Sequence, residues 1–338
     1  MIKQFETQGC KVIVAAEGAS SYLLSNEFPN VTILPLRGYR IRYTKYKRFF
    51  AVKILLQIPQ ILAAIRREHQ WLQKAIIEHD VDLVISDNRF GFWSPKTPSV
   101  FITHQLAIEA PFSWLKKIIQ RINYKHIGHF TECWVPDFQG SLNIAGDLSH
   151  PAKLPGVPTN YIGPLSRFEK RQSDPFLYKW LFVLSGPEPQ RSLLEAKILT
   201  LISSLEGNIL LVRAKPGSTE RIATSENCTV KNHLSNSEME AAFSASQFIV
   251  SRAGYTTVME LLTLGKKSVL IPTPGQTEQE YLAKRLFEQQ WCYTCGQDDD
   301  ISSALQMATT FNYRLPTIPS SSIAQTVVAA LQLIPKKG

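Results

Sequence analysis

Short apolar runs and longer helical stretches alternate along the whole of this 338-residue chain. That alternation is typical of βαβ units, in which crossover helices bury parallel strands. The runs that we expect to be strands are rich in Val, Ile and Leu and comprise residues 11–15, 31–34, 82–86, 99–103, 132–135, 180–185, 209–212, 248–251, 268–271 and 291–294. The pattern therefore predicts an α/β fold with two parallel sheets.

A cluster of prolines and charges near the middle of the chain marks a domain boundary. It leads into the polar stretch of residues 166–175, which is typical of a linker. We therefore expect an N-terminal domain at residues 1–165 and a C-terminal domain at residues 166–338. Residues 323–334 have apolar side chains at helical spacing after three serines, so we expect a closing helix there.

The start of the chain differs from that of an ordinary doubly wound domain, which begins with a buried strand and a glycine-rich turn. Residues 2–7 and Gly9 are typical of the end of a helix instead. We favour a recorded start that lies roughly 20 residues inside the first βα unit, so that the first strand and loop are missing. The alternative is a fold that lacks this strand.

The composition excludes several classes of protein. Apolar residues make up 44% of the chain, with 17 glycines and 20 prolines, so it is globular rather than disordered or collagen-like. Residues 51–65 are interrupted by Lys53 and Pro59, well short of the roughly 18 apolar residues of a membrane span. The first residues lack the apolar core of a secretory signal, and five scattered cysteines fit a reducing compartment. We therefore expect a cytoplasmic protein.

Positive charge is concentrated in the first half. The formal net charge of +9 divides into +7 for residues 1–165 and +2 for residues 166–338. Between Glu27 and Glu68 nine basic residues occur without an acidic one, interleaved with aromatic residues, and residues 112–121 repeat the pattern. This pattern suits an anionic membrane surface, which would make the protein peripheral at the inner face of the membrane. The alternative, which base rates for charged faces favour, is a solvated helix face with its apolar side in the core. Binding of single-stranded nucleic acid is a third interpretation and the least favoured of the three. We therefore expect no nucleic-acid partner.

Two strand-to-helix turns in the second half carry the residues best suited to chemistry. The strand at residues 248–251 leads into Arg252 and Gly254, and the strand at residues 268–271 leads into residues 272–280. In a parallel sheet such turns line the carboxyl ends of the strands, where ligands bind. Free N–H groups and the positive dipole end of each following helix form an anion site that suits a diphosphate.

Glu260 lies one turn inside the first of these helices. Its carboxylate suits a ribose diol, and the hydroxyls of Thr256 and Thr257 can donate hydrogen bonds to phosphate. The alternative is helix capping, because Thr257-x-x-Glu260 and Thr277-x-x-Glu280 both match the capping box. Two such turns in one domain favour the ligand site.

The segment SRAGYTTVMELLTLGKKSVLIPTPGQTEQEYLAKRL, which begins at Ser251, resembles the C-terminal domain of MurG-type glycosyltransferases of family 28. The Ser-x-x-Gly turn, the helical glutamate and the Gln/Glu turn carry the resemblance, which covers residues 182–286 well and the first half more loosely. It implies the GT-B fold, in which two Rossmann-like domains with parallel sheets face each other across a cleft. It also implies an inverting hexosyltransferase that needs no metal and no cofactor and takes a nucleotide sugar, UDP-linked, as donor.

The resemblance assigns donor-binding residues group by group. It implies that Glu260 holds the ribose hydroxyls of the UDP-sugar. The residues that it places at the sugar hydroxyls are Gln276, Glu278 and Gln279, and those that it places at the diphosphate are Ser251, Gly254, Thr256 and Thr257.

Further donor-binding residues come from two loops and two cations. Residues 185–191 occupy the family's phosphate-loop position, which adds Gly186, Gln190 and Arg191, although the two prolines of this loop remove N–H donors. The resemblance places His233 and Leu234 where the family reads uracil, largely through backbone groups. Arg213 and Arg252 are additional cations that can meet phosphate.

The candidate catalytic residues lie in the first half. Residues 101–105, FITHQ, resemble the family's strand that ends in a His-Glu-Gln type turn on the acceptor side. In this interpretation His104 and Asp87, both just past strand ends, face the acceptor, and either can deprotonate its hydroxyl. The family's glycine-rich first loop, with its histidine, has no counterpart in this sequence.

These observations predict a glycosyltransferase that moves a sugar from a UDP-linked donor to an acceptor hydroxyl. The acceptor is unknown, and a lipid-linked one is an option. One alternative keeps the fold and changes the reaction to epimerisation or hydrolysis of a nucleotide sugar. Another is a non-catalytic partner subunit that binds only the donor or the membrane.

Overall fold

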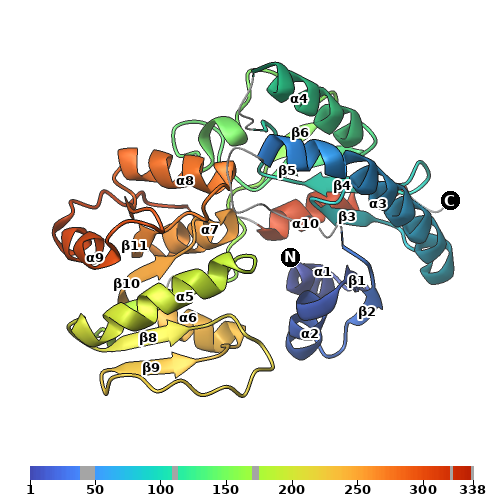
Figure 1. Ribbon diagram of the computed structural model, residues 1–338. Coiled ribbons are helices and arrows are strands. Elements are labelled where there is room, and N and C mark those ends of the chain that lie inside the picture. The colour runs from blue at the N-terminus through green and yellow to red at the C-terminus, as the bar shows by residue number, and fades with distance from the viewer. Residues whose placement is uncertain (39–49, 109–112, 170–174, 320–322, 336–338) are drawn as a thin grey trace. The chain divides into compact units, whose positions relative to one another are not determined.

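The structure, a computed structural model, describes residues 1–38, 50–108, 113–169, 175–319 and 323–335. The chain divides into two compact units (Figure 1). One comprises Met1–Pro164 with Ser321–Gly338, and the other Leu165–Ser320. Every strand pair in both units is parallel, which confirms the α/β class that the alternating apolar runs predicted.

The second unit is built on a six-stranded parallel sheet with the order β12-β11-β10-β7-β8-β9. Its strands are β7 (Tyr178–Val183), β8 (Ile209–Val212), β9 (Cys228–Lys231), β10 (Ser246–Ser251), β11 (Lys267–Leu270) and β12 (Tyr293–Thr294). The chain starts in the middle of the sheet, adds β8 and β9 on one side, and then continues with β10 on the other. The strand order therefore reverses between β7 and β10, which is where doubly wound folds bind ligands.

Both faces of this sheet are buried, which explains why its central strands are apolar throughout rather than alternating. Trp180, Phe182 and Phe248 pack into one core with α5 (Gln190–Leu201) and α9 (Ile301–Thr310). Leu181 and Ile249 alternate with them along the strands and have no exposed surface either. The other helical elements of this unit are η3 (Ile202–Ser204), α6 (Asn236–Ser244), α7 (Tyr255–Leu264) and α8 (Thr277–Glu288).

The first unit holds two parallel sheets where the sequence predicted one. In the smaller sheet β1 (Ile13–Ala16) pairs with β2 (Thr32–Pro35). The larger has β3 (Val84–Asp87), β4 (Ser99–Ile102), β5 (Glu132–Val135) and β6 (Thr159–Tyr161) in chain order. Among the described residues no strand joins β1 to β3 by hydrogen bonds, although Ala15, Leu36 and Val84 share one apolar cluster.

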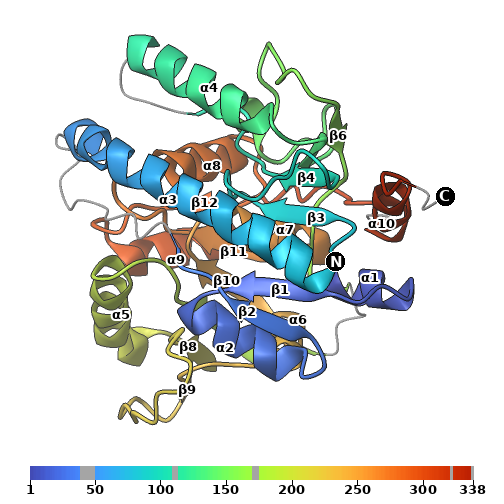
Figure 2. The same ribbon diagram turned by 90° about the vertical axis from the view of Figure 1, so that its right-hand side faces the viewer.

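The helical elements of the first unit are α1 (Ile2–Thr7), α2 (Gly18–Glu27), α3 (Phe50–His79), α4 (Ser113–Ile127), η2 (Gly146–Leu148) and α10 (Ile323–Leu331). The long helix α3 runs across β3 and β4 (Figure 2). The closing helix α10 contacts α1, so it belongs to this unit. Assigning the chain to the second domain as far as residue 338 was therefore wrong for this helix, because an apolar terminal helix packs where an apolar face is open and not where its neighbours in sequence lie.

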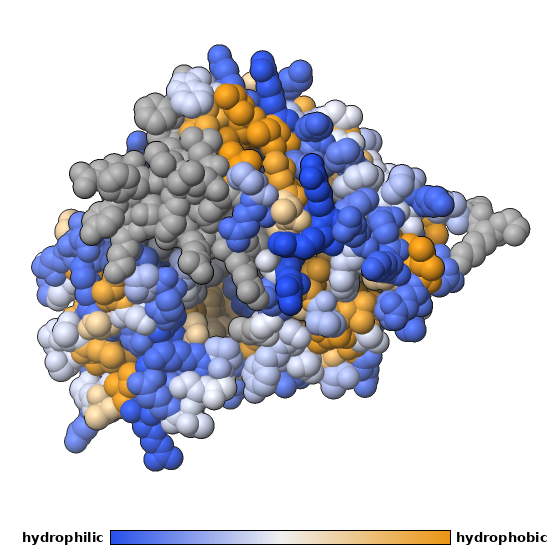
Figure 3. Space-filling model, turned by 45° about the vertical axis from the view of Figure 1, so that its right-hand side comes forward, coloured by the Kyte–Doolittle hydropathy of each residue, from blue (hydrophilic) through white to orange (hydrophobic). Residues whose placement is uncertain are grey.

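Helix α4 carries an exposed apolar stripe. Trp114, Ile118 and Ile122 follow each other at four-residue spacing and are 58%, 46% and 41% exposed. Figure 3 shows hydrophobic side chains gathered on the upper part of the molecule, over α4, with hydrophilic ones around them. The adjacent face of the helix bears three exposed cations, Lys117, Arg121 and Lys125. Within the residues that the structure describes, no helix is both long enough and apolar enough to cross a membrane.

The first of the two predicted basic segments is only partly described. Arg37, Arg66 and Arg67 are exposed. Five further basic residues of this segment lie outside the described residues: Arg40, Arg42, Lys45, Lys47 and Arg48.

Candidate functional site

Three turns of the second unit meet at one edge of its sheet. The strands β7, β10 and β11 end close together, because Ser251 is paired in register with both Val183 and Leu270. The turns that follow these strands therefore lie at the carboxyl edge, beside the point where the strand order reverses. The structure thus brings together the predicted donor residues of these turns.

The turn before α7 leaves an open helix N-terminus. Gly254 is the N-cap residue, with φ −71° and ψ 137°, and no side chain caps the helix. A Cβ atom at Gly254 would meet no atom within 4 Å, so there is open space against this backbone. Thr256 is exposed and Thr257 half-buried, whereas Ser251 is buried and its hydroxyl donates to the carbonyl of Arg252 at 3.2 Å. The uncapped N–H groups and the helix dipole suit an anion.

Glu260 is buried, with 2% of its surface exposed, and Arg167 holds its carboxylate. Nε of Arg167 donates to Oε1 at 2.6 Å and Nη2 donates to Oε2 at 3.3 Å. Nη1 of the same arginine donates to Oδ1 of Asn236 at the start of α6, at 2.8 Å. Because each carboxylate oxygen accepts more than one hydrogen bond, Glu260 keeps acceptor capacity for a hydroxyl. The sequence analysis missed Arg167, which lies 93 positions away from its partner.

The capping interpretation is wrong for both glutamates that matched it. Thr257 lies inside α7, whose N-cap is a glycine, so Thr257-x-x-Glu260 is no capping box. The N-cap of α8 is Gln276. Oε1 of Glu280 accepts the N–H of Gly275, the residue before this N-cap, at 3.2 Å. Ser235 forms a genuine capping box with its third helical residue at the start of α6. Three glutamates near helix starts in this domain therefore differ in role. Glu238 belongs to the capping box of α6, Glu280 accepts a backbone N–H before α8, and Glu260 pairs with Arg167.

The start of α8 holds half-buried polar side chains that bond to one another. Oε1 of Gln279 accepts the N–H of Thr273 at 2.9 Å, and the Gln279 amide group donates to the side chain of Gln276. Glu278 is half-buried beside them. These groups lie at the carboxyl edge of the sheet, where their hydrogen bonds to one another fix the start of α8.

The loop between β7 and α5 approaches the turn that follows β11. Gly186 has φ +99°, a conformation that favours glycine, and a Cβ atom there would lie 3.6 Å from the hydroxyl of Thr273. Gln190 is the first residue of α5, and its Oε1 accepts a hydrogen bond from the side chain of Gln297 at 2.9 Å. The phosphate-loop position thus packs directly on its neighbouring turn.

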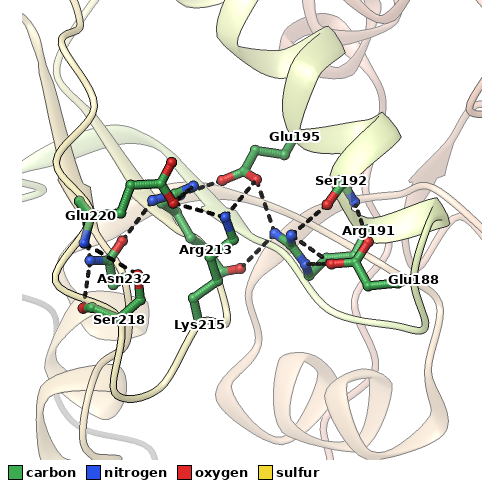
Figure 4. Close-up of polar contacts among 9 residues, drawn as sticks. All are labelled: Glu188, Arg191, Ser192, Glu195, Arg213, Lys215, Ser218, Glu220 and Asn232. Atoms are coloured by element: carbon green, nitrogen blue, oxygen red, sulfur yellow. Dashed lines mark hydrogen bonds and ion pairs between the residues drawn. The ribbon is translucent and has the colours of Figure 1, made fainter.

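Arg191 and Arg213 are both neutralised by carboxylates inside the protein (Figure 4). Arg191 pairs with Glu195 at 3.0 Å and with Glu188 at 2.7 Å. Arg213 pairs with Glu195 and, at 3.0 Å, with Glu220. Burial raises the pKa of Glu195, but hydrogen bonds and charges from the two arginines outweigh it, so the net shift is downward. These arginines therefore hold α5 against the end of β8 with their charges already balanced.

Asn232 holds the loop that follows β8. Its Nδ2 donates to the carbonyls of Ser218 and Glu220, both at 2.8 Å, and its Oδ1 accepts from Arg213 at 2.8 Å (Figure 4). The next residues, His233 and Leu234, are exposed and buried respectively. The predicted base-reading segment is thus anchored through its asparagine to the buried ion pairs.

In the first unit Asp87 and His104 lie at the carboxyl ends of neighbouring strands. Asp87 ends β3 and is paired in register with Ile102, two positions before His104. Desolvation by surrounding protein atoms raises the pKa of Asp87, an effect that the charges of His104 and Arg89 reduce. A carboxylate with a raised pKa beside an imidazole is an arrangement suited to general-base chemistry. Within the described residues no three His, Cys, Asp or Glu side chains gather as metal ligands do.

The second unit matches a known family. Residues 216–310 match the glycosyltransferase family 28 C-terminal domain. This stretch of the second unit is similar to a family 28 C-terminal domain. The match contains the α7 turn, Glu260 and the α8 turn, so the predicted resemblance to MurG-type proteins is confirmed where its motifs lie.

Curated relatives agree with this family. A UDP-N-acetylglucosamine–N-acetylmuramyl-(pentapeptide) pyrophosphoryl-undecaprenol N-acetylglucosamine transferase from Rhodopseudomonas palustris (strain BisB5) is 45% identical over 47 residues, 14% of this chain and 13% of the relative. The transferase of the same name from Bradyrhizobium diazoefficiens is 25% identical over 155 residues, 44% of this chain and 40% of the relative. The aligned stretches thus span less than half of these relatives.

Solved structures extend the likeness to the fold of the whole chain. MurG of Acinetobacter baumannii has a TM-score of 0.52 at 18% identity, over 98% of this chain and 89% of that one. The glycotransferase of kitacinnamycin has a TM-score of 0.62 at 13% identity over the same shares. The GT-B fold that the resemblance implied is therefore confirmed for both units.

Proposed function

We propose that the protein is a glycosyltransferase that moves a sugar from a nucleotide sugar to an acceptor hydroxyl, with inversion and without a metal. One observation carries the proposal. The family 28 match coincides with an uncapped helix N-terminus beside open space at Gly254, and the buried carboxylate of Glu260 lies in the same helix. An anion site and a diol acceptor are what a nucleoside diphosphate requires.

In this proposal the second unit binds a UDP-linked donor. The N-terminus of α7 receives the diphosphate, with Gly254 allowing close approach and Thr256 and Thr257 donating hydroxyl hydrogen bonds. Glu260 accepts hydrogen bonds from the ribose. The sugar hydroxyls bind the network of Gln276, Glu278 and Gln279, and the uracil lies against the backbone of His233 and Leu234.

The chemical step exchanges one bond at the anomeric carbon for another. The acceptor oxygen forms a bond to that carbon as the bond to the diphosphate oxygen breaks, and UDP leaves with the electron pair. The negative charge that develops on the diphosphate is stabilised by the N–H groups and dipole of α7. Asp87 or His104 takes the proton of the acceptor hydroxyl, and the raised pKa of Asp87 supports this role.

A lipid-linked acceptor at an anionic membrane surface is the partner that the surface of α4 supports. Its stripe of Trp114, Ile118 and Ile122 lies beside exposed cations, the combination that seats a helix at a lipid interface. The relatives named above have an undecaprenol-linked acceptor in their names. Flotation with vesicles containing phosphatidylglycerol tests this, since Ile118→Ser, a change at an exposed position, should weaken binding to these vesicles and leave the unfolding temperature unchanged.

Thermal-shift measurements with UDP-, dTDP- and GDP-linked sugars test the donor assignment, and a UDP-sugar should give the largest stabilisation. Incubation of the protein with that donor and no acceptor then distinguishes glycosyl transfer from epimerisation and from hydrolysis of the nucleotide sugar. A changed sugar would indicate epimerisation and a released sugar hydrolysis. If no nucleotide sugar stabilises the protein, the donor assignment is wrong.

A further inference from the structure

The second unit buries three arginines, and one of them lacks a carboxylate partner. Arg191, Arg213 and Arg252 are 5%, 1% and 1% exposed. The first two form the ion pairs of Figure 4, whereas in the described part of the chain no carboxylate pairs with Arg252. Burial lowers the pKa of Arg252 to about 10. A buried cation without an anion opposes folding, so its presence calls for an explanation.

Within the described residues, only neutral groups accept hydrogen bonds from Arg252. Nη1 donates to the carbonyls of Ile271 and Pro272, both at 3.2 Å. Nη2 donates to the carbonyl of Gln190 at 2.9 Å and to the side chain of Gln297. The buried Nε has no hydrogen-bond partner in the part of the chain that the structure describes. The guanidinium therefore joins the turns that follow β7, β11 and β12, and its positive charge stays unbalanced.

This charge lies at the edge of the sheet that carries the proposed diphosphate site. Arg252 directly follows β10, and Gly254, the open N-cap of α7, comes two positions later. The turn after β7 and the turn after β11 form the other walls of this edge. Arg252 is thus the residue through which these turns keep their positions relative to the helix N-terminus.

We propose that Arg252 is a positioning residue for the donor diphosphate and that the bound diphosphate supplies its missing counter-charge. The guanidinium is closed off from solvent, so it acts through its charge and through the turns it holds rather than by contact with phosphate. The proposal rests on the proposed function, but its anion requirement can be measured without a nucleoside. At an effective dielectric constant of about 20, a unit charge that lies within about 10 Å of a phosphate changes affinity by about tenfold or more.

The experiment compares two variants of the full chain by calorimetric titration with UDP and with uridine. Arg252→Gln keeps hydrogen-bond donors and removes the charge, whereas Arg252→Lys keeps the charge with fewer donors. We expect Arg252→Gln to weaken UDP binding about tenfold or more while uridine binding stays unchanged. Arg252→Lys should retain most of the preference for UDP over uridine. Equal weakening of UDP and uridine in both variants would show a purely structural tether and overturn the proposal.

A matched control removes a cation that lies beside the start of β10, the strand that Arg252 follows. Lys266 is a partly buried cation just before β11, and it donates to the carbonyl of Ser244 at the end of α6 and to that of Ser246 at the start of β10. Lys266→Gln changes the net charge by the same amount and should leave the preference for UDP over uridine intact. The same loss of preference in this variant would assign the effect to overall charge and overturn the proposal.

Sodium pyrophosphate and the wild-type protein keep the proposal testable if Arg252→Gln does not fold. An unbalanced buried charge predicts that pyrophosphate alone raises the unfolding temperature, and no rise would refute the proposal. If pyrophosphate stabilises the protein but UDP adds nothing, the proposed function fails and the anion site stands. If UDP binds tightly and Arg252→Gln keeps its preference over uridine, the role of Arg252 fails and the proposed function stands.

Discussion

Replacing Glu260 with glutamine tests whether its carboxylate binds the ribose. Glutamine keeps the shape of the side chain and removes the charge. The Arg167 side chain is 50% exposed, so water can reach the guanidinium that loses its partner. We therefore expect a stability loss of about 1–3 kcal/mol, within the range for an unsatisfied polar group.

The loss of donor affinity in Glu260→Gln depends on the hydrogen bonds that the Glu260 carboxylate can still accept beside those from Arg167. A hydrogen bond to a charged group contributes roughly 1.5–3 kcal/mol, and a glutamine still makes one neutral bond. Two ribose hydroxyls on Glu260 therefore predict a loss of about 2–3 kcal/mol, which is roughly a 30- to 150-fold rise in the Kd of UDP. Calorimetric titration measures this directly.

The same titration with 2′-deoxy-UDP isolates the diol. Because this ligand lacks one of the two hydroxyls, Glu260→Gln should cost it about tenfold less than it costs UDP. Glu288→Gln, an exposed carboxylate at the end of α8, makes the same charge change away from the turns and should leave both affinities unchanged. Equal losses for UDP and 2′-deoxy-UDP, or an unchanged Kd of UDP, would refute the ribose contact.

Three further predictions concern Gly254, two histidines and a buried ion pair. Gly254→Ala should change the free energy of unfolding by less than about 1 kcal/mol, because the φ and ψ of Gly254 suit alanine and the new methyl group meets no atom. It should nevertheless weaken UDP binding about tenfold, because the methyl group fills the proposed phosphate space. Thermal unfolding checks the first expectation and calorimetric titration the second. Burial lowers the pKa of His126 and His129, so the folded state binds fewer protons than the unfolded one. Stability should be complete above about pH 6.5 and fall as the pH drops further, and a flat urea midpoint between pH 8 and pH 5 would contradict this. Glu195→Gln leaves two buried arginines short of a partner and should cost about 3–5 kcal/mol, read as a fall in the urea midpoint, whereas a change below 1 kcal/mol would contradict the structural role.

Local pattern was sufficient to find the elements that hold the site. Buried strands such as β10 and β11 have continuous apolar runs, and the turns after them are short, so their positions follow from sequence alone. Two strands were missed, β6 and β9. Both lie at sheet edges and alternate or lack buried residues, so their runs are short and polar. Such an edge strand forms because its backbone hydrogen-bonds to the neighbouring strand, and its own side chains give little sign of it.

Pairing across long sequence distances accounts for what the sequence did not reveal. Nothing near Arg252 in sequence indicates that its guanidinium reaches Gln190 or Gln297, since those contacts exist only once β7, β10 and β12 occupy one sheet. The cations Arg191 and Arg213 were both candidates for phosphate, and the sequence could not show that one glutamate lies between them. Which arginine is neutralised and which is not is a property of the folded sheet.

Glu260 shows most clearly where sequence reasoning reaches its limit. A glutamate three positions after a threonine fits a cap, a ligand acceptor and an ion pair equally well, because all three need only a carboxylate near a helix start. The structure removes the first, since Gly254 is the N-cap, and adds the third, since Arg167 binds both oxygens. It does so without excluding the second, because a half-exposed arginine can share the carboxylate with a ribose. An ion pair that fixes the orientation of Glu260 before the donor arrives reduces the ordering that binding would otherwise require.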